Sequence, residues 1–127
     1  MMQLQCYCMI ICNISKEIKM KPSDRTYLQN VLDNFIYAGI NRLSHSGNMQ
    51  HRFRLDATEL KQVTGRQRLH ETVVHDVESF FDGSLVKATY DQERAAFDID
   101  LNLSQCALNH QQSSALSDAM TYYHADA

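Results

Sequence analysis

The sequence predicts one α+β domain. In its core a helix, a strand, two helices and a β-hairpin follow one another, with a further strand before this core and a further helix after it. The chain has 127 residues, 44% of them hydrophobic, which is enough for one buried core. Apolar residues recur every three or four positions in some stretches and every second position in others, which are the periods of helices and strands. One Pro and four Gly exclude collagen-like chains and most disordered compositions.

The predicted organisation has three parts. Residues 1–22 are expected to form a strand and a connector, because apolar side chains occupy alternate positions from Leu4 to Ile14. Met20 would also be an ordinary protein start, so the alternative is that residues 1–19 are an upstream extension. Residues 23–103 are expected to form the core, and residues 104–127 a C-terminal helix and tail.

The first helix of the core is predicted to begin at Ser23 and to end near Ser44. Ser23 is a favourable N-cap, and Asp24 places a negative charge in the first turn. Gly47 is expected to end the helix in the left-handed conformation. The buried face is predicted to consist of Tyr27, Leu28, Val31, Leu32, Phe35, Ile36, Ile40 and Leu43.

A short strand is predicted next, because His51, Phe53 and Leu55 alternate with two arginines. Asp56 and Glu59 then stand at the spacing of a capping box, which predicts a second helix over residues 57–63.

A third helix is predicted to start near Arg66. Thr64 and Gln67 repeat the capping-box spacing in front of it. Its buried stripe is expected to consist of Leu69, Val73, Val77, Phe80 and Phe81.

Two alternating stretches, residues 85–91 and 97–103, predict a β-hairpin whose loop is Gln92-Glu93-Arg94. The polar residues of both stretches are expected to face away from the core. A last helix is predicted over residues 113–123, because Leu116, Met120 and Tyr123 have helical spacing.

Three segments resemble the winged helix-turn-helix family: Glu59-Leu60-Lys61-Gln62-Val63-Thr64-Gly65, the apolar stripe after it, and Asp82-Gly83-Ser84-Leu85-Val86. The resemblance implies a sequence-specific transcriptional regulator whose third helix enters the DNA major groove. It implies that bases are read by Arg66, Gln67 and Arg68. It implies that phosphates are contacted by Arg52, Arg54, Lys61 and Arg94. The basic side chains should then share one continuous face, with Asp98 and Asp100 elsewhere.

The distribution of charge supports a second hypothesis. Residues 42–68 contain six Lys or Arg and two Asp or Glu. Residues 69–100 contain only two Lys or Arg but eight Asp or Glu. The alternative is therefore a non-catalytic interaction module or inhibitor that presents an acidic face to a basic protein. The candidate acids are Glu71, Asp76, Glu78, Asp98 and Asp100. The N-terminal strand and the C-terminal helix lie outside the core and are candidates for a homodimer interface.

The sequence contains few residue patterns that are typical of enzymes or metal-binding sites. His70 and His75 stand five positions apart, so their rings would diverge on a helix rather than bind one metal. The run Asp98-x-Asp100-x-Asn102 lacks the glycine and the glutamate that complete an EF-hand loop. No nucleophile elbow and no Gly-rich phosphate loop occurs. The sequence thus predicts no enzyme, no cofactor and no metal.

The expected location is the cytoplasm. No stretch reaches the roughly 20 apolar residues that span a bilayer, so no membrane partner is expected. The spacing of the four cysteines does not suit a disulfide framework, which favours a reducing compartment.

Overall fold

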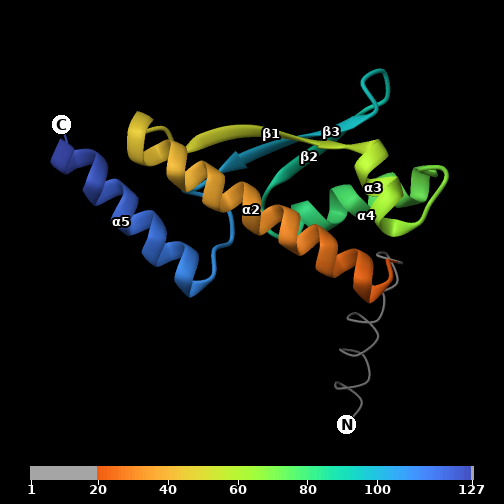
Figure 1. Ribbon diagram of the computed structural model, residues 1–127, viewed down its shortest axis with the longest axis horizontal. Helices are drawn as coiled ribbons and strands as arrows, with labels where there is room; N and C mark the ends of the chain where they lie inside the picture. Colours follow the sequence, from red (N-terminus) through yellow and green to blue (C-terminus); the bar gives the residue numbers. More distant parts are fainter. Residues whose placement is uncertain (1–19, 127) are drawn as a thin grey trace, which may run out of the picture.

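The computed structural model describes residues 20–126 (Figure 1), and the strand predicted between Leu4 and Ile14 lies outside this range. The described part is an α+β fold of four helices and a three-stranded antiparallel sheet. Its elements are α2 (Pro22–Ser46), β1 (Gln50–Asp56), α3 (Ala57–Thr64), α4 (Glu71–Asp82), β2 (Lys87–Asp91), β3 (Ala96–Asn102) and α5 (His110–Asp126).

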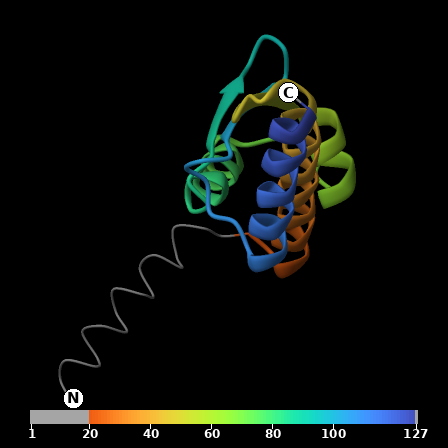
Figure 2. The ribbon, with the colours of Figure 1, turned by 90° about the vertical axis from the view of Figure 1, so that its left-hand side faces the viewer.

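The sheet has the strand order β1-β3-β2, so that β3 lies in the middle. The helices lie on one side of it (Figures 1 and 2). Most side chains that point toward the helices are buried, among them Leu55, Phe97 and Ile99, whereas most of the alternate side chains are exposed or half-buried. The predicted hairpin and the predicted inward and outward residues of the strands are confirmed, because a period of two fixes the face of every residue.

Helix α2 carries the predicted apolar stripe. Its almost fully buried members are Leu28, Leu32, Ile36, Ile40 and Leu43. The helix ends as predicted: Gly47 has a φ of 74°, and its N–H donates to the Leu43 carbonyl at 2.8 Å. The predicted N-cap is wrong by two residues, because Lys21 occupies the N-cap position and Pro22 is the first helical residue. Proline suits this position because its φ is already helical and its missing N–H would have had no partner.

The start of α4 is the main departure from the prediction. Thr64 does not cap a new helix; it is the last residue of α3, and its Oγ1 donates to the Leu60 carbonyl at 2.7 Å. Gly65 then takes a φ of 71°, which ends α3. Residues 66–70 form a connection, and α4 begins only at Glu71. The predicted helix start near Arg66 is therefore wrong.

The capping box predicted for α3 is not formed either. Asp56 occupies the N-cap position, but its side chain makes no capping hydrogen bond.

Helix α5 packs along the C-terminal half of α2 (Figures 1 and 2). Gln112 is buried and its Nε2 donates to Asp33 Oδ1 at 2.8 Å, while the Tyr123 ring lies close to Gly47. The predicted last helix is confirmed and is longer than residues 113–123. Within residues 20–126, no helix has the length and apolar character that crossing a membrane requires.

Gly47→Ala is expected to lower the free energy of unfolding by about 2 kcal/mol, because two costs add. The left-handed φ of 74° is unfavourable for alanine, and its Cβ would lie 2.6 Å from Cζ of Tyr123. Gly65→Ala is the matched control, since Gly65 has a similar φ of 71° but no atom within 4 Å of an added Cβ. This control is expected to lose only about 1 kcal/mol. Urea unfolding measures both losses, and equal losses would contradict a cost from the Tyr123 contact.

Candidate nucleic-acid interface

The face of the sheet turned away from the helices, named the outer face, carries most of the candidate residues. The register places Arg52 opposite Asp100, and Asp100 opposite Lys87 on the other neighbouring strand. In the next row Arg54 lies opposite Asp98. Cations thus occupy both edge strands, and carboxylates occupy the central strand. These cross-strand neighbours have opposite charges, which stabilises the sheet as well as shaping its surface.

The outer face is hollowed by a shallow depression of about 620 Å³. The depression is lined by Arg52, Phe53, Arg54, Lys87, Thr89, Arg94, Asp98, Ile99 and Asp100. Four of these side chains are cations and two are carboxylates, which leaves a surplus of positive charge. The arginines on β1 and Lys87 are exposed, so they are free to meet an anion.

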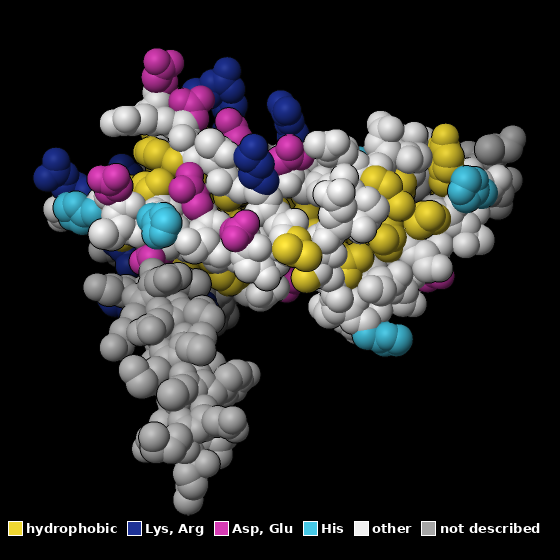
Figure 3. All heavy atoms as spheres, turned by 180° about the vertical axis from the view of Figure 1, so that it is seen from behind, with side chains coloured by type: hydrophobic (Ala, Val, Ile, Leu, Met, Phe, Trp, Pro, Cys, Tyr) yellow, Lys and Arg dark blue, Asp and Glu magenta, His cyan; other side chains and the backbone are white. Residues whose placement is uncertain are grey.

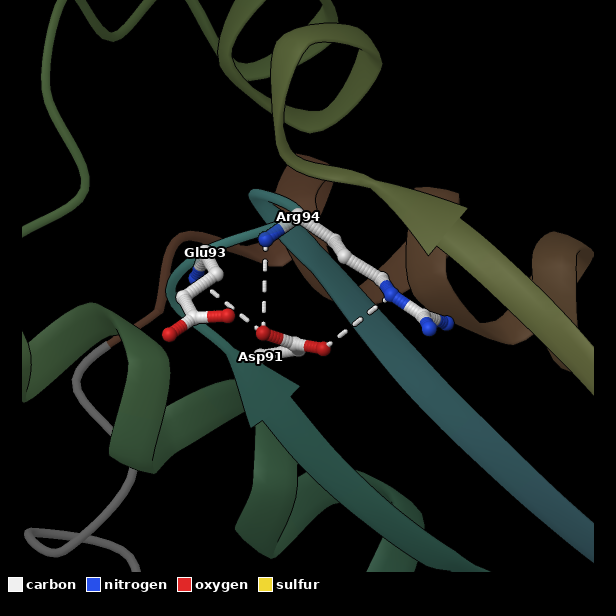
Figure 4. Close-up of polar contacts among 3 residues, drawn as sticks. All are labelled: Asp91, Glu93 and Arg94. Carbon is white, nitrogen blue, oxygen red and sulfur yellow. Dashed lines mark hydrogen bonds and ion pairs between the residues drawn. The ribbon is translucent and has the colours of Figure 1, made fainter.

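Arg94 reaches this surface from the turn of the hairpin (Figure 4). Asp91 Oδ1 accepts hydrogen bonds from the backbone N–H groups of Glu93, at 3.0 Å, and Arg94, at 3.3 Å. Asp91 Oδ2 lies 3.6 Å from Arg94 Nε, in an ion pair. The carboxylate therefore fixes the turn, while the Arg94 side chain stays 62% exposed.

The predicted base-reading residues do not lie on a helix. Arg66, Gln67 and Arg68 belong to the connection before α4. Arg66 Nη1 lies 3.0 Å from the buried Asp24 Oδ2 on α2, so its charge is used inside the fold. Gln67 and Arg68 are exposed. Helix α4 contains no Lys or Arg, so it presents no cation to a groove.

The structure thus brings together only part of the predicted basic face. Arg52, Arg54 and Arg94 meet on the outer face, whereas Lys61 is half-buried on α3 and does not line the depression. Lys87 joins them and was not among the predicted contacts. Its outward position follows from the alternation of residues 85–91, but its nearness to Arg52 depends on the strand register.

The expectation that Asp98 and Asp100 lie away from the basic side chains is wrong. Both carboxylates lie between the cations, because β3 is the central strand. Gln50 Nε2 also donates to Asp100 Oδ1 at 2.9 Å. Figure 3 shows a similar mixture at the hairpin end of the molecule, where Lys and Arg side chains intermingle with Asp and Glu.

The other candidate acids lie on α4. Glu78 Oε2 accepts a hydrogen bond from the Tyr90 N–H at 3.0 Å, and Asp76 is only 6% exposed. Glu71 is exposed at the start of the helix. The structure therefore distributes the predicted acidic surface over two elements and engages part of it in contacts within the fold.

Within residues 20–126 no group of three His, Cys, Asp or Glu is placed to hold a metal ion. Cys106 is buried, and this burial raises the pKa of its thiol. A thiol with a raised pKa is a poor nucleophile, since the thiolate is the reactive form. Cys106 does not line the depression of the outer face.

Comparisons with family models, with curated proteins and with solved structures find no match for this chain.

Proposed function

We propose that the protein is a non-catalytic DNA-binding module of winged-helix-like architecture that holds duplex DNA by its phosphates. The observation that carries this proposal is the exposed outer face, on which four cationic side chains from three segments surround one depression. The element order helix, strand, helix, helix, strand, strand is consistent with the winged-helix resemblance.

The spacing of the cations suits a DNA groove. Neighbouring strands lie about 4.8 Å apart, so β1 and β2 are separated by about 10 Å across β3. This separation lies between the widths of the minor groove, about 6 Å, and the major groove, about 12 Å. Arg and Lys side chains that start from β1 and β2 can therefore reach phosphates on opposite sides of one groove.

The contacts proposed here position the protein without specifying a sequence. Contacts to phosphate carry no base information, and α4 offers no Arg or Lys to base edges. Exposed Gln67 and Arg68 would lie beside the DNA only if the connection before α4 also approached it. We therefore expect similar affinities for unrelated duplexes, and this replaces the sequence-specific reading that the resemblance implied.

Titration of a labelled duplex of mixed sequence is expected to show binding that weakens steeply with salt. Four phosphate contacts correspond to a slope of about −3.6 for the logarithm of the association constant against the logarithm of the salt concentration. Fluorescence anisotropy at several salt concentrations measures the slope, and a second duplex of unrelated sequence is the control. Absence of binding at tens of micromolar protein and about 50 mM salt, or a slope near zero, would exclude the proposal.

A further inference from the structure

Within residues 20–126, the outer edge of β1 presents backbone groups that pair with no other strand. The Met49 carbonyl accepts from the Leu103 N–H, and the Ala57 N–H donates to the Ala95 carbonyl, both at 2.9 Å. These bonds extend the β1–β3 register, so odd-numbered residues of β1 point their backbone groups toward β3. The backbone groups of the residues between them therefore point away from the sheet. These residues are Gln50, Arg52, Arg54 and Asp56.

The two edges of the sheet differ. On β2, the outward Tyr90 N–H donates to Glu78 Oε2, and α4 lies against this strand. On β1, no strand pairs with the outer edge within residues 20–126. Figure 1 shows β1 running above α2. Exposed edges of this kind are templates for a further strand.

Two stacked aromatic side chains, Phe35 and Phe53, lie on the inner side of the same edge. Phe53, on the inner face of β1, stacks on Phe35 of α2 with ring centroids 4.7 Å apart. The Arg42 guanidinium lies 4.6 Å from the centroid of the Phe53 ring. Both phenylalanines are only half-buried, although the inner face is covered by helices elsewhere. An added strand would therefore find apolar surface on the inner side of the edge.

The charges of the β1 edge favour an added strand that carries acidic side chains. Arg52 and Arg54 are exposed on the outer side, so a strand with acidic residues at alternate positions would complement them. Strand β3 already shows this pattern on the opposite side of β1: Asp98 and Asp100 face the two arginines, and apolar residues alternate with them.

We propose that the free edge of β1 binds an extended protein segment in which acidic and apolar residues alternate. The segment pairs antiparallel with β1, its acidic side chains lie beside Arg52 and Arg54, and its apolar side chains pack on Phe35 and Phe53. This is strand addition, in which main-chain hydrogen bonds supply affinity and side chains supply selectivity. The site is independent of the proposed DNA binding, but it uses the same two arginines, so an acidic segment and DNA would compete.

The pairing geometry makes a specific demand on the segment. In an antiparallel pair, residues directly opposite each other share a face and point their backbone groups toward each other or away from each other together. Arg52 and Arg54 point their backbone groups outward, so the acidic residues of the segment must point theirs toward β1. The apolar residues must point theirs away.

A synthetic peptide with the sequence of residues 96–102, Ala-Phe-Asp-Ile-Asp-Leu-Asn, tests this demand. The labelled peptide, with blocked termini, is expected to bind the full chain saturably in fluorescence anisotropy. N-methylation at its first aspartate removes a hydrogen bond to β1 and is expected to weaken binding about tenfold. N-methylation at its isoleucine alters the backbone equally but on the solvent side, and is expected to change binding less than about threefold.

Protein variants supply a second, independent measure. Arg52→Gln with Arg54→Gln is expected to weaken peptide binding about tenfold, whereas Lys87→Gln, on the opposite edge strand, is expected to leave it unchanged. Equal losses from the two N-methylations would overturn the proposal, because replacement of the native β3 by the peptide would use both N–H groups. Absence of saturable binding up to about 1 mM peptide would also overturn it. The peptide assay contains no DNA, so the two proposals are tested separately. The protein can bind DNA without binding the peptide, and it can bind the peptide without binding DNA.

Discussion

Asp98→Asn combined with Asp100→Asn is expected to tighten binding to duplex DNA about tenfold. Each carboxylate lies among the cations of the outer face and repels a phosphate bound there. At about 6 Å in water this repulsion is about 0.7 kcal/mol, so removal of both charges contributes about 1.4 kcal/mol, or about a factor of ten. Asparagine keeps an oxygen at the position that accepts from Gln50 Nε2. Anisotropy titrations at low salt measure the change.

The mirrored variant, Arg52→Gln with Arg54→Gln, is expected to weaken DNA binding and to reduce the magnitude of the salt slope by about 2. Both variants lose cross-strand attraction of about 0.2–1 kcal/mol per pair, so both are expected to unfold at a slightly lower temperature. A folding defect would weaken DNA binding in both. Opposite changes in affinity with parallel changes in stability therefore assign the effect to charge, and an aspartate variant that binds no better would contradict the proposed interface.

The sequence was most informative where one periodicity was unambiguous. The alternation from His51 to Leu55 and from Phe97 to Leu103 correctly predicted which side chains face the core, because successive strand residues point to opposite faces. The apolar stripe of α2 and its end at Gly47 were equally readable, since few residues other than glycine adopt a φ of 74°.

The boundary between α3 and α4 was harder to predict, because a capping motif specifies residue types but not which backbone group their side chains bind. Thr64 and Gln67 have the spacing of a capping box, yet the Thr64 hydroxyl donates to the carbonyl of Leu60 inside the preceding helix. Side chains of this type bind any nearby backbone group, so the same residues suit a helix end or a helix start. The predicted second helix over residues 57–63 matches α3 closely, but nothing in the spacing delays the start of α4 to Glu71.

Which residues lie side by side on the outer face depends on the order and register of the strands, and the periodicity of the sequence does not predict either. The alternation predicted that Asp98, Asp100 and Lys87 point outward, but not which strand lies in the middle. With β3 in the middle, carboxylates separate the basic residues of β1 from those of β2 and the hairpin. A sequence in which these residues stand far apart gives no local signal of that arrangement, since pairing is a tertiary property.

Arg66→Ala is expected to lower the free energy of unfolding by about 2 kcal/mol. The variant would leave the Asp24 carboxylate, which is only 4% exposed, without its cation. Removal of one partner from a fully buried ion pair costs about 3–5 kcal/mol, and exposed pairs contribute about 0–1 kcal/mol. The Arg66 side chain is 23% exposed, so an intermediate value is expected. No residue between 20 and 126 donates a hydrogen bond to Asp24 Oδ2, so the ionic contact with Arg66 is its main compensation within the described part of the chain.

A double-mutant cycle that combines Arg66→Ala with Asp24→Asn separates the contribution of this ion pair to the free energy of unfolding from other effects of the Arg66 substitution. If the ion pair holds the connection before α4 against α2, the double variant should be more stable than the sum of the two single losses predicts. Arg68→Ala is the matched control, because Arg68 is an exposed arginine of the same connection. It is expected to change stability by less than about 0.5 kcal/mol. Strictly additive losses in urea unfolding would mean that Arg66 is not the partner that stabilises Asp24, and its guanidinium would then be available to a ligand outside the fold.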